Sequence, residues 1–153
     1  MKKNNQSGRS LIEMLAVVMI IGILTIGATA GLNQAMDKYR VGKMHTDILS
    51  IDSEIVNLYA WMRGYPHESN DAPKDVTATL CENEIFPDGC DENSKPQNPY
   101  GGNYTVTTTS TTKTIEATNL PDDVCEDLVA QEWGNYVVND PSCSSGTFTI
   151  TFE

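Results

Sequence analysis

The residues with the clearest chemical potential are four cysteines, Cys81, Cys90, Cys125 and Cys143. An even number of cysteines in one part of a chain indicates disulfides formed in an oxidising compartment, and four cysteines allow three pairings. Pairing sequence neighbours, Cys81 with Cys90 and Cys125 with Cys143, would close two loops that each add about 2–4 kcal/mol of stability. A zinc site is the disfavoured alternative, because no two cysteines have the C-x2-C spacing and both histidines lie far upstream.

A second candidate cluster is acidic, Asp88-Gly89-Cys90-Asp91-Glu92-Asn93. Carboxylates bind calcium, but their spacing here departs from that of a calcium-binding loop, so we interpret the segment as a solvated turn. The sequence contains no glycine-rich phosphate loop, no H-E-x-x-H motif and no nucleophile elbow. We therefore expect neither an enzyme nor a bound cofactor.

The elements that position the cysteines are short and mixed in type. Residues 103–109 and 113–118 are rich in β-branched side chains with apolar residues alternating among them, which predicts an antiparallel hairpin rather than a glycosylated stalk. Residues 119–123 carry the proline and acids of a helix start, and this helix is predicted to end at Trp133. Residues 146–152 predict the last strand of the sheet.

Upstream of the cysteines, residues 14–36 form a stretch of 23 residues without a charge. The hydrocarbon core of a membrane is about 30 Å thick and is spanned by roughly 20 apolar residues in a helix. A single span must be helical, because lipid offers the backbone no hydrogen-bond partners. The stretch therefore predicts a membrane-spanning helix.

The helical pattern continues beyond this stretch. Apolar residues recur at alternating spacings of three and four, at Val41, Met44, Ile48, Ile51, Ile55, Leu58 and Met62. This spacing places them on one helical face, which we expect to be a core face covered by the rest of the chain rather than a coiled-coil seam. Gly64 and Pro66 then form a helix stop. The sequence predicts one helix over residues 9–63.

Charge is distributed as unevenly as hydrophobicity. The chain has 10 basic and 21 acidic residues, a formal net charge of −11. Residues 64–153 hold 3 basic and 16 acidic residues, whereas residues 9–63 hold 5 of each. This acidic surface argues against nucleic acid as the main partner, because phosphate binding needs clustered lysine and arginine.

A pair of opposite charges, Arg9 and Glu13, lies at the entrance of the uncharged stretch. A carboxylate in an apolar environment costs several kcal/mol unless it is paired, so Glu13 is a candidate functional residue. Its partner is either Arg9, one helical turn away, or the amino terminus of a neighbouring chain. A conventional signal peptide is the alternative for this region, with Lys2 and Lys3 at its start and a cut after Ala28-Thr29-Ala30.

The run Gly8-Arg9-Ser10-Leu11-Ile12-Glu13 and the apolar residues 14–24 after it resemble the class III signal of type IV prepilins and type II secretion pseudopilins. The resemblance covers residues 1–40. It implies that a prepilin peptidase cuts between Gly8 and Arg9, that Arg9 becomes N-methylated, and that Glu13 acts in subunit assembly. Less specifically, the turn at residues 98–102 and the cysteine-bearing segment 120–128 are similar to parts of pilin heads.

The resemblance implies a pilin-like α+β fold, in which a long N-terminal helix, membrane-spanning then amphipathic, packs on a small antiparallel sheet. The expected parts are a leader at residues 1–8, the long helix at 9–63 with its transmembrane or filament-core segment at 11–32, and a disulfide-bonded head at 64–153. The expected function is a structural subunit of a type IV pilus-like filament. The alternatives are a pseudopilin of a type II secretion system and a secreted binding module cut after Ala30.

The partners implied by the resemblance are identical or related pilin subunits, a prepilin peptidase, an inner-membrane assembly platform and, before assembly, the membrane itself. The protein is expected to lie in the inner membrane with a periplasmic head, and then to join an extracellular pilus or a periplasmic pseudopilus.

Overall fold

The computed structural model describes the backbone from Ser7 to Glu153, and the side chains of that range except residues 7–10, 27–30 and 33. Most of the predicted leader, the side chain of Arg9 and those of Ala28-Thr29-Ala30 therefore lie outside the described residues. The chain divides into two compact units, residues 1–38 and residues 39–153.

The first unit is helical over all of its described residues, which belong to helix α1 (Ser7–Tyr59). Its described large apolar side chains, from Leu11 to Met36, are each 48–73% exposed. Among the helical residues that the structure describes, no stretch is long and apolar enough to cross a membrane. The membrane-spanning segment predicted at residues 11–32 stays a prediction.

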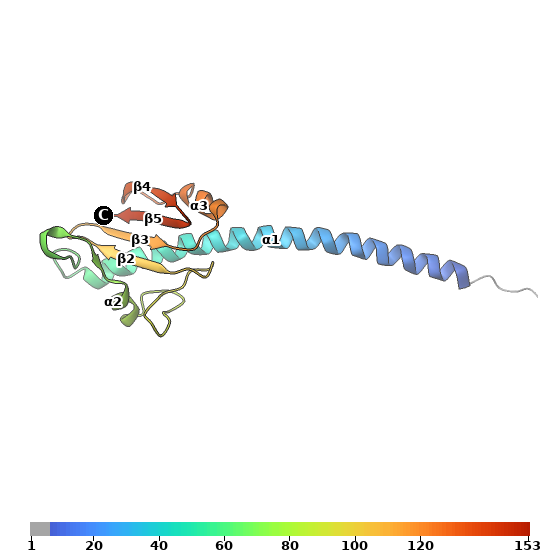
Figure 1. Cartoon of the computed structure of the whole chain (residues 1–153), viewed down its shortest axis with the longest axis horizontal. Coiled ribbons are helices and arrows are strands. Elements are labelled where there is room, and N and C mark those ends of the chain that lie inside the picture. Colours follow the sequence, from blue (N-terminus) through green and yellow to red (C-terminus); the bar gives the residue numbers. More distant parts are fainter. Residues whose placement is uncertain (1–6) are drawn as a thin grey trace, which may run out of the picture. The chain divides into compact units, whose positions relative to one another are not determined.

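The second unit combines the last part of α1 with a five-stranded antiparallel sheet of order β1-β2-β3-β5-β4 (Figure 1). The strands are β1 (Lys74–Asp75), β2 (Tyr104–Thr108), β3 (Lys113–Ala117), β4 (Val137–Ser144) and β5 (Thr147–Phe152). A 3-10 turn η1 (Ser69–Asp71) and two short helices, α2 (Thr77–Glu82) and α3 (Asp122–Val129), complete it. The β2–β3 pair confirms the predicted hairpin, and β5 confirms the predicted last strand.

The predicted core face of α1 is confirmed from Val41 to Ile55, Leu58 is only partly buried, and Met62 is 40% exposed and lies beyond the end of the helix. Val41, Met44, Ile48, Ile51 and Ile55 are all buried, and they belong to one apolar core with the inward residues of the sheet. Those residues line up across strands, since Val106 pairs with Ile115 and Ile115 with Ile150. Burying one such side chain stabilises the fold by about 1.5–3 kcal/mol. The observed fold is the predicted α+β class with a pilin-like arrangement.

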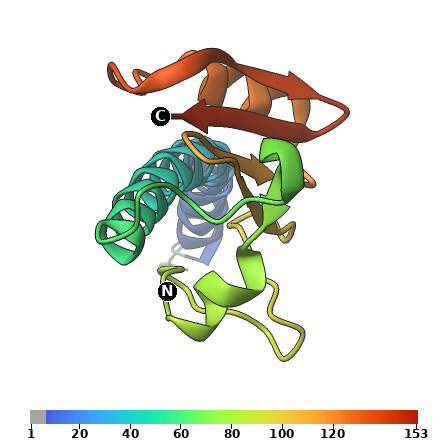
Figure 2. The ribbon, with the colours of Figure 1, turned by 90° about the vertical axis from the view of Figure 1, so that its left-hand side faces the viewer.

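The two short helices lie at opposite ends of the sheet. Figure 2 shows α3 beside β4 and β5, and α2 with the loop that follows it at the other end. The disulfides belong to these two regions, so each end of the sheet has its own cross-link.

The predicted end of the long helix at residue 63 is wrong by four residues, because α1 ends at Tyr59. Backbone bonds from Ala60 to Asn57 and from Met62 to Tyr59 tighten the chain into turns beyond this point. The turn lets Tyr65 donate a backbone hydrogen bond of 3.2 Å to Ser110. A Cβ on Gly64 would lie 2.6 Å from the Ser110 carbonyl oxygen, which explains the glycine at this crossing.

The predicted end of the second helix at Trp133 is also wrong, because α3 ends at Val129. Continued helical spacing would have carried Trp133 away from the face of Val124 and Leu128. The chain instead leaves the helix, and the Trp133 side chain becomes buried. Its indole N–H donates to the Leu128 carbonyl at 2.9 Å, and its ring stacks on Phe148 at 5.3 Å. Burial of a large aromatic side chain thus outweighs one further turn of helix.

Candidate functional site

The largest candidate interaction surface is the first unit of α1. Every described side chain from Leu11 to Ile26 is exposed, including Glu13. Because these residues are consecutive in a helix, the apolar surface surrounds the whole circumference. An exposed apolar surface of this extent marks a membrane or protein contact site. Glu13 is the one carboxylate within this described stretch, and Gly8 and Arg9 lie beyond the side chains that the structure describes.

The four cysteines form two disulfides in the head. Cys81 at the end of α2 bonds to Cys90, with their Cα atoms 5.7 Å apart. Cys125 in α3 bonds to Cys143 in β4, with their Cα atoms 5.8 Å apart. Both Cα separations lie within the usual range for disulfides. These are the two sequence-neighbour pairs, and each joins a short helix to a neighbouring segment.

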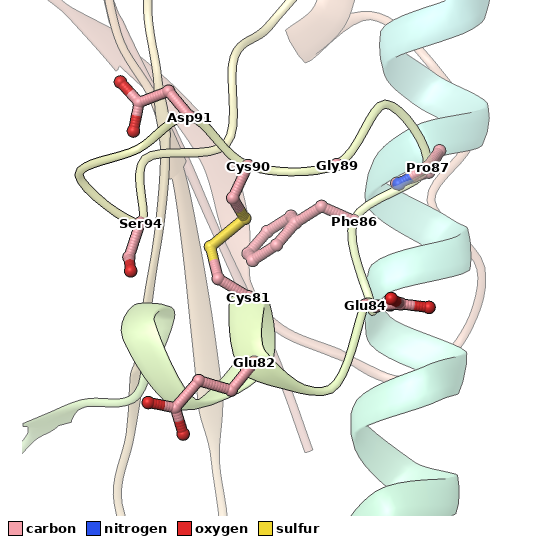
Figure 3. A pocket seen from close by; sticks show the side chains of 9 residues that line it. All are labelled: Cys81, Glu82, Glu84, Phe86, Pro87, Gly89, Cys90, Asp91 and Ser94. Carbon is pink, nitrogen blue, oxygen red and sulfur yellow. A yellow bond between two sulfur atoms is a disulfide. The ribbon is translucent and has the colours of Figure 1, made fainter.

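A shallow pocket of about 570 Å³ adjoins the first disulfide. Figure 3 shows the disulfide and the ring of Phe86 at its centre, with the carboxylates of Glu82, Glu84 and Asp91 pointing away from one another. Asp91 accepts backbone hydrogen bonds from Asn93 at 2.9 Å and from Lys95 at 2.8 Å. Within the described part of the chain, no three potential ligands gather to hold a metal ion. The two backbone hydrogen bonds to the Asp91 carboxylate stabilise a turn in the acidic segment.

A charged cluster links α1 to this same loop. The Lys43 ammonium lies 3.1 Å from Asp47 and 2.7 Å from Asp88, so one lysine serves two carboxylates. Asp47 is 6% exposed. Burial raises the pKa of the Asp47 carboxyl, and hydrogen bonding to Lys43 opposes this rise. The hydrogen bond to Asp88 is the largest cause of the raised pKa of Lys43. Burial, and then the nearby charges of Asp47 and Asp88, raise the pKa of Tyr104.

A second charged cluster joins α1 to strand β3. Lys113 is 1% exposed, and its ammonium lies 3.0 Å from the Asp52 carboxylate of α1. The ammonium also donates to the Glu153 main-chain oxygen at 2.7 Å and to the Tyr65 hydroxyl at 3.2 Å. One buried lysine of β3 therefore contacts α1, the segment after α1 and the residue that follows β5.

The two lysine clusters do not follow from the cysteine and carboxylate patterns of the sequence. Lys43 and Asp47 have the spacing of a helical ion pair, which is a local signal. Lys113 precedes Ile115 by two residues, so strand alternation places it on the buried face. The contacts to Asp88 and Asp52 join residues 45 and 61 positions apart, and nothing local in the sequence indicates them.

Two known protein families match the chain, one in each of its two units. The family described as prokaryotic N-terminal methylation motif matches residues 3–29. The family described as PilS N terminal matches residues 38–136. Together with the fold, these matches define a type IV pilin-like protein. The chain belongs to the PilS N-terminal family.

No curated protein and no solved structure is significantly similar to the chain.

Proposed function

We propose that this protein is a non-enzymatic structural subunit of a type IV pilus-like filament. The observation that carries the proposal is the apolar surface of α1, exposed around its whole circumference over residues 11–26, within the match to the methylation motif. Such a surface needs either lipid or other apolar helices as its surroundings. A membrane before assembly and a filament core after it supply these two environments in turn.

The match to the methylation motif supports the following processing. A prepilin peptidase removes residues 1–8 by cutting between Gly8 and Arg9, and Arg9 is then N-methylated. The helix from residue 9 remains in the inner membrane at residues 11–32, with the disulfide-bonded head, residues 64–153, in the periplasm. An inner-membrane assembly platform then adds the subunit to related subunits.

Glu13 has a specific role in this proposal. A carboxylate among apolar helices is stable when it is paired, and the new amino terminus of a neighbouring subunit offers a positive charge. Pairing Glu13 with that terminus sets the axial position of the incoming subunit. The ion pair thus fixes the axial register between neighbouring helices, whereas apolar contacts alone would allow the helices to slide past each other.

Mass spectrometry of sheared surface filaments tests the processing. The expected polypeptide begins at Arg9, carries one added methyl group and lacks four hydrogens because of its two disulfides. A chain beginning at Met1, Gly31 or Asn33 would contradict the proposal, and Gly31 would indicate a conventional signal peptide. Recovery from the periplasm alone, with loss of exoprotein secretion on deletion, would indicate a pseudopilin instead.

Glu13→Gln tests the assembly role. The variant is expected to be cut and methylated normally and to lower the filament yield about tenfold or more, since losing one desolvated charge pair costs at least about 1.4 kcal/mol. Glu54→Gln is the matched control, because Glu54 is an exposed glutamate of the same helix within the second unit. Equal filament yields from the two variants would contradict the role given to Glu13.

A further inference from the structure

The region closed by the Cys81–Cys90 disulfide contains a tight turn between Phe86 and Cys90. Gly89 donates a backbone hydrogen bond of 2.9 Å to Phe86, which closes a tight turn with Pro87 and Asp88 at its centre. Gly89 has a φ of +75°, a conformation that glycine adopts without strain. The turn therefore presents the Asp88 carboxylate at its tip.

Two anchors flank Asp88 along the chain. Two residues before it, Phe86 is 4% exposed and belongs to the apolar core. Two residues after it, Cys90 is bonded to Cys81 at the end of α2. Helix α2 is itself fixed, because Leu80 is fully buried. Figure 3 shows the disulfide and Phe86 side by side, with Pro87 next to α1.

The contact that this geometry produces is the bond between Asp88 and Lys43. It joins residues 45 positions apart at 2.7 Å, although the Asp88 side chain is 56% exposed. For an exposed carboxylate on an unanchored loop, the entropy cost of ordering the side chain and the loop offsets much of the favourable free energy of the ion pair. Fixing the loop at both ends removes most of that entropy before the contact forms.

We propose that the Cys81–Cys90 disulfide is a redox-sensitive clamp that holds Asp88 on Lys43 of α1. Two electrons and two protons from a dithiol reductant convert the disulfide to two thiols, and the reductant becomes a disulfide. Reduction removes the covalent link to α2 and leaves the burial of Phe86 and the bridge between Cys90 and Pro96 as the remaining anchors. On this weaker support Asp88 leaves Lys43, and Lys43 keeps Asp47. The oxidation state of the loop is thereby coupled to the stability of α1 around residues 43–47.

Coupling between two equilibria is reciprocal, and this gives the experiment. If the disulfide favours the Lys43–Asp88 contact, the contact favours the disulfide by the same factor. The full-length protein in detergent micelles is equilibrated with dithiothreitol, and the reduced fraction of each cysteine pair is measured by alkylation and peptide mass spectrometry. The intact contact is expected to shift the Cys81–Cys90 equilibrium two- to fivefold towards the disulfide, the range of a partly exposed ion pair.

Three variants separate this coupling from a simple effect of charge on the thiols. Asp88→Asn and Lys43→Gln both break the contact, so both are expected to raise the reduced fraction of Cys81–Cys90. A bare charge effect would have opposite signs for these two substitutions, because one removes a negative charge and the other a positive one. Asp91→Asn is the matched control, since Asp91 lies in the same loop and does not contact Lys43.

Opposite shifts from Asp88→Asn and Lys43→Gln, or an equal shift from Asp91→Asn, would overturn the proposal. The Cys125–Cys143 equilibrium is expected to stay unchanged in all three variants, and a matching shift there would also overturn it. Hydrogen exchange of the peptide spanning residues 40–48 is a second readout. Asp88→Asn is expected to speed its exchange two- to fivefold when the disulfide is intact and to have no effect in a Cys81→Ser/Cys90→Ser background.

Discussion

At the scale of single residues, the buried Lys113 is the side chain whose loss should matter most to the head. Its ammonium is held by Asp52, Tyr65 and the main-chain oxygen of Glu153, so removing it leaves a mostly buried carboxylate without its counter-charge. Lys113→Met is expected to destabilise the head by about 2–3 kcal/mol, less than a fully buried pair because the Asp52 side chain is 21% exposed.

Chemical denaturation of the full-length protein in micelles, followed by tryptophan fluorescence, measures this effect, since Trp133 is buried. Lys74→Met is the control, because Lys74 is an exposed lysine at the edge of the same sheet. A Lys113→Met protein as stable as the control would show that the cluster contributes little.

Contacts between residues that are close in the sequence can be predicted from it, whereas contacts between distant residues cannot. The sequence allows three cysteine pairings, and the structure forms the sequence-local one, with separations of 9 and 18 residues that loop closure favours. The face occupied by Lys113 follows from its spacing to Ile115. Its partner Asp52 does not, because many arrangements of helix and sheet satisfy the same pattern of apolar residues.

At the scale of elements, one exposed stripe of α1 in the second unit carries no charge. This stripe lies opposite the core face, is exposed throughout, and consists of Tyr39, Gly42, Thr46, Leu49, Ser53 and Val56. In a chain of high negative charge, like-charged subunits approach each other at lowest cost on an uncharged face. We expect this stripe to lie against other subunits in the proposed filament.

Thr46→Lys tests the stripe by placing a charge within it. The variant is expected to lower the filament yield about tenfold or more, because an unpaired lysine at a packed interface costs at least about 1.4 kcal/mol. Thr79→Lys is the matched control, as Thr79 is an exposed threonine of helix α2. Pelleting of sheared filaments measures both variants. Normal yield from Thr46→Lys would place the stripe on the filament surface.

The sequence predicted the strands that have a strong alternating pattern of apolar residues, but it did not predict the end strand β4. The hairpin and β5 combine β-branched residues with alternation, and both were predicted. Strand β4 was not, because its sequence Val-Val-Asn-Asp-Pro-Ser-Cys-Ser has the composition of a loop. It is an end strand that pairs with β5 alone, so the tertiary context supplies the strand that local propensity does not.

At the scale of the whole molecule, the charge distribution predicts a salt dependence. Removing residues 1–8 leaves 8 basic and 21 acidic residues, a formal charge of −13, and the residues from 64 onward carry this excess. The Debye length is about 30 Å at 0.01 M salt and about 8 Å at 0.15 M. Repulsion between heads therefore reaches much further at low salt.

We expect the proposed filaments to assemble less and to dissociate more at 0.01 M than at 0.15 M sodium chloride. Sedimentation of purified filaments after dilution into each buffer measures this. Sucrose at equal osmolality is the control for effects other than screening. Filaments that sediment equally in both buffers would indicate that neighbouring heads stay far apart or that opposite charges meet between them.

The irregular edge formed by β4 affects how readily these molecules can aggregate through their sheets. An edge strand with a regular row of unpaired N–H and C=O groups can template a strand of another chain, which leads towards cross-β aggregates. Strand β4 has two register shifts against β5, and Pro141 within it lacks an N–H. At the other end of the sheet, β1 is two residues long. Crowded heads thus have little means to convert into amyloid, even at the high local concentration that polymerisation creates.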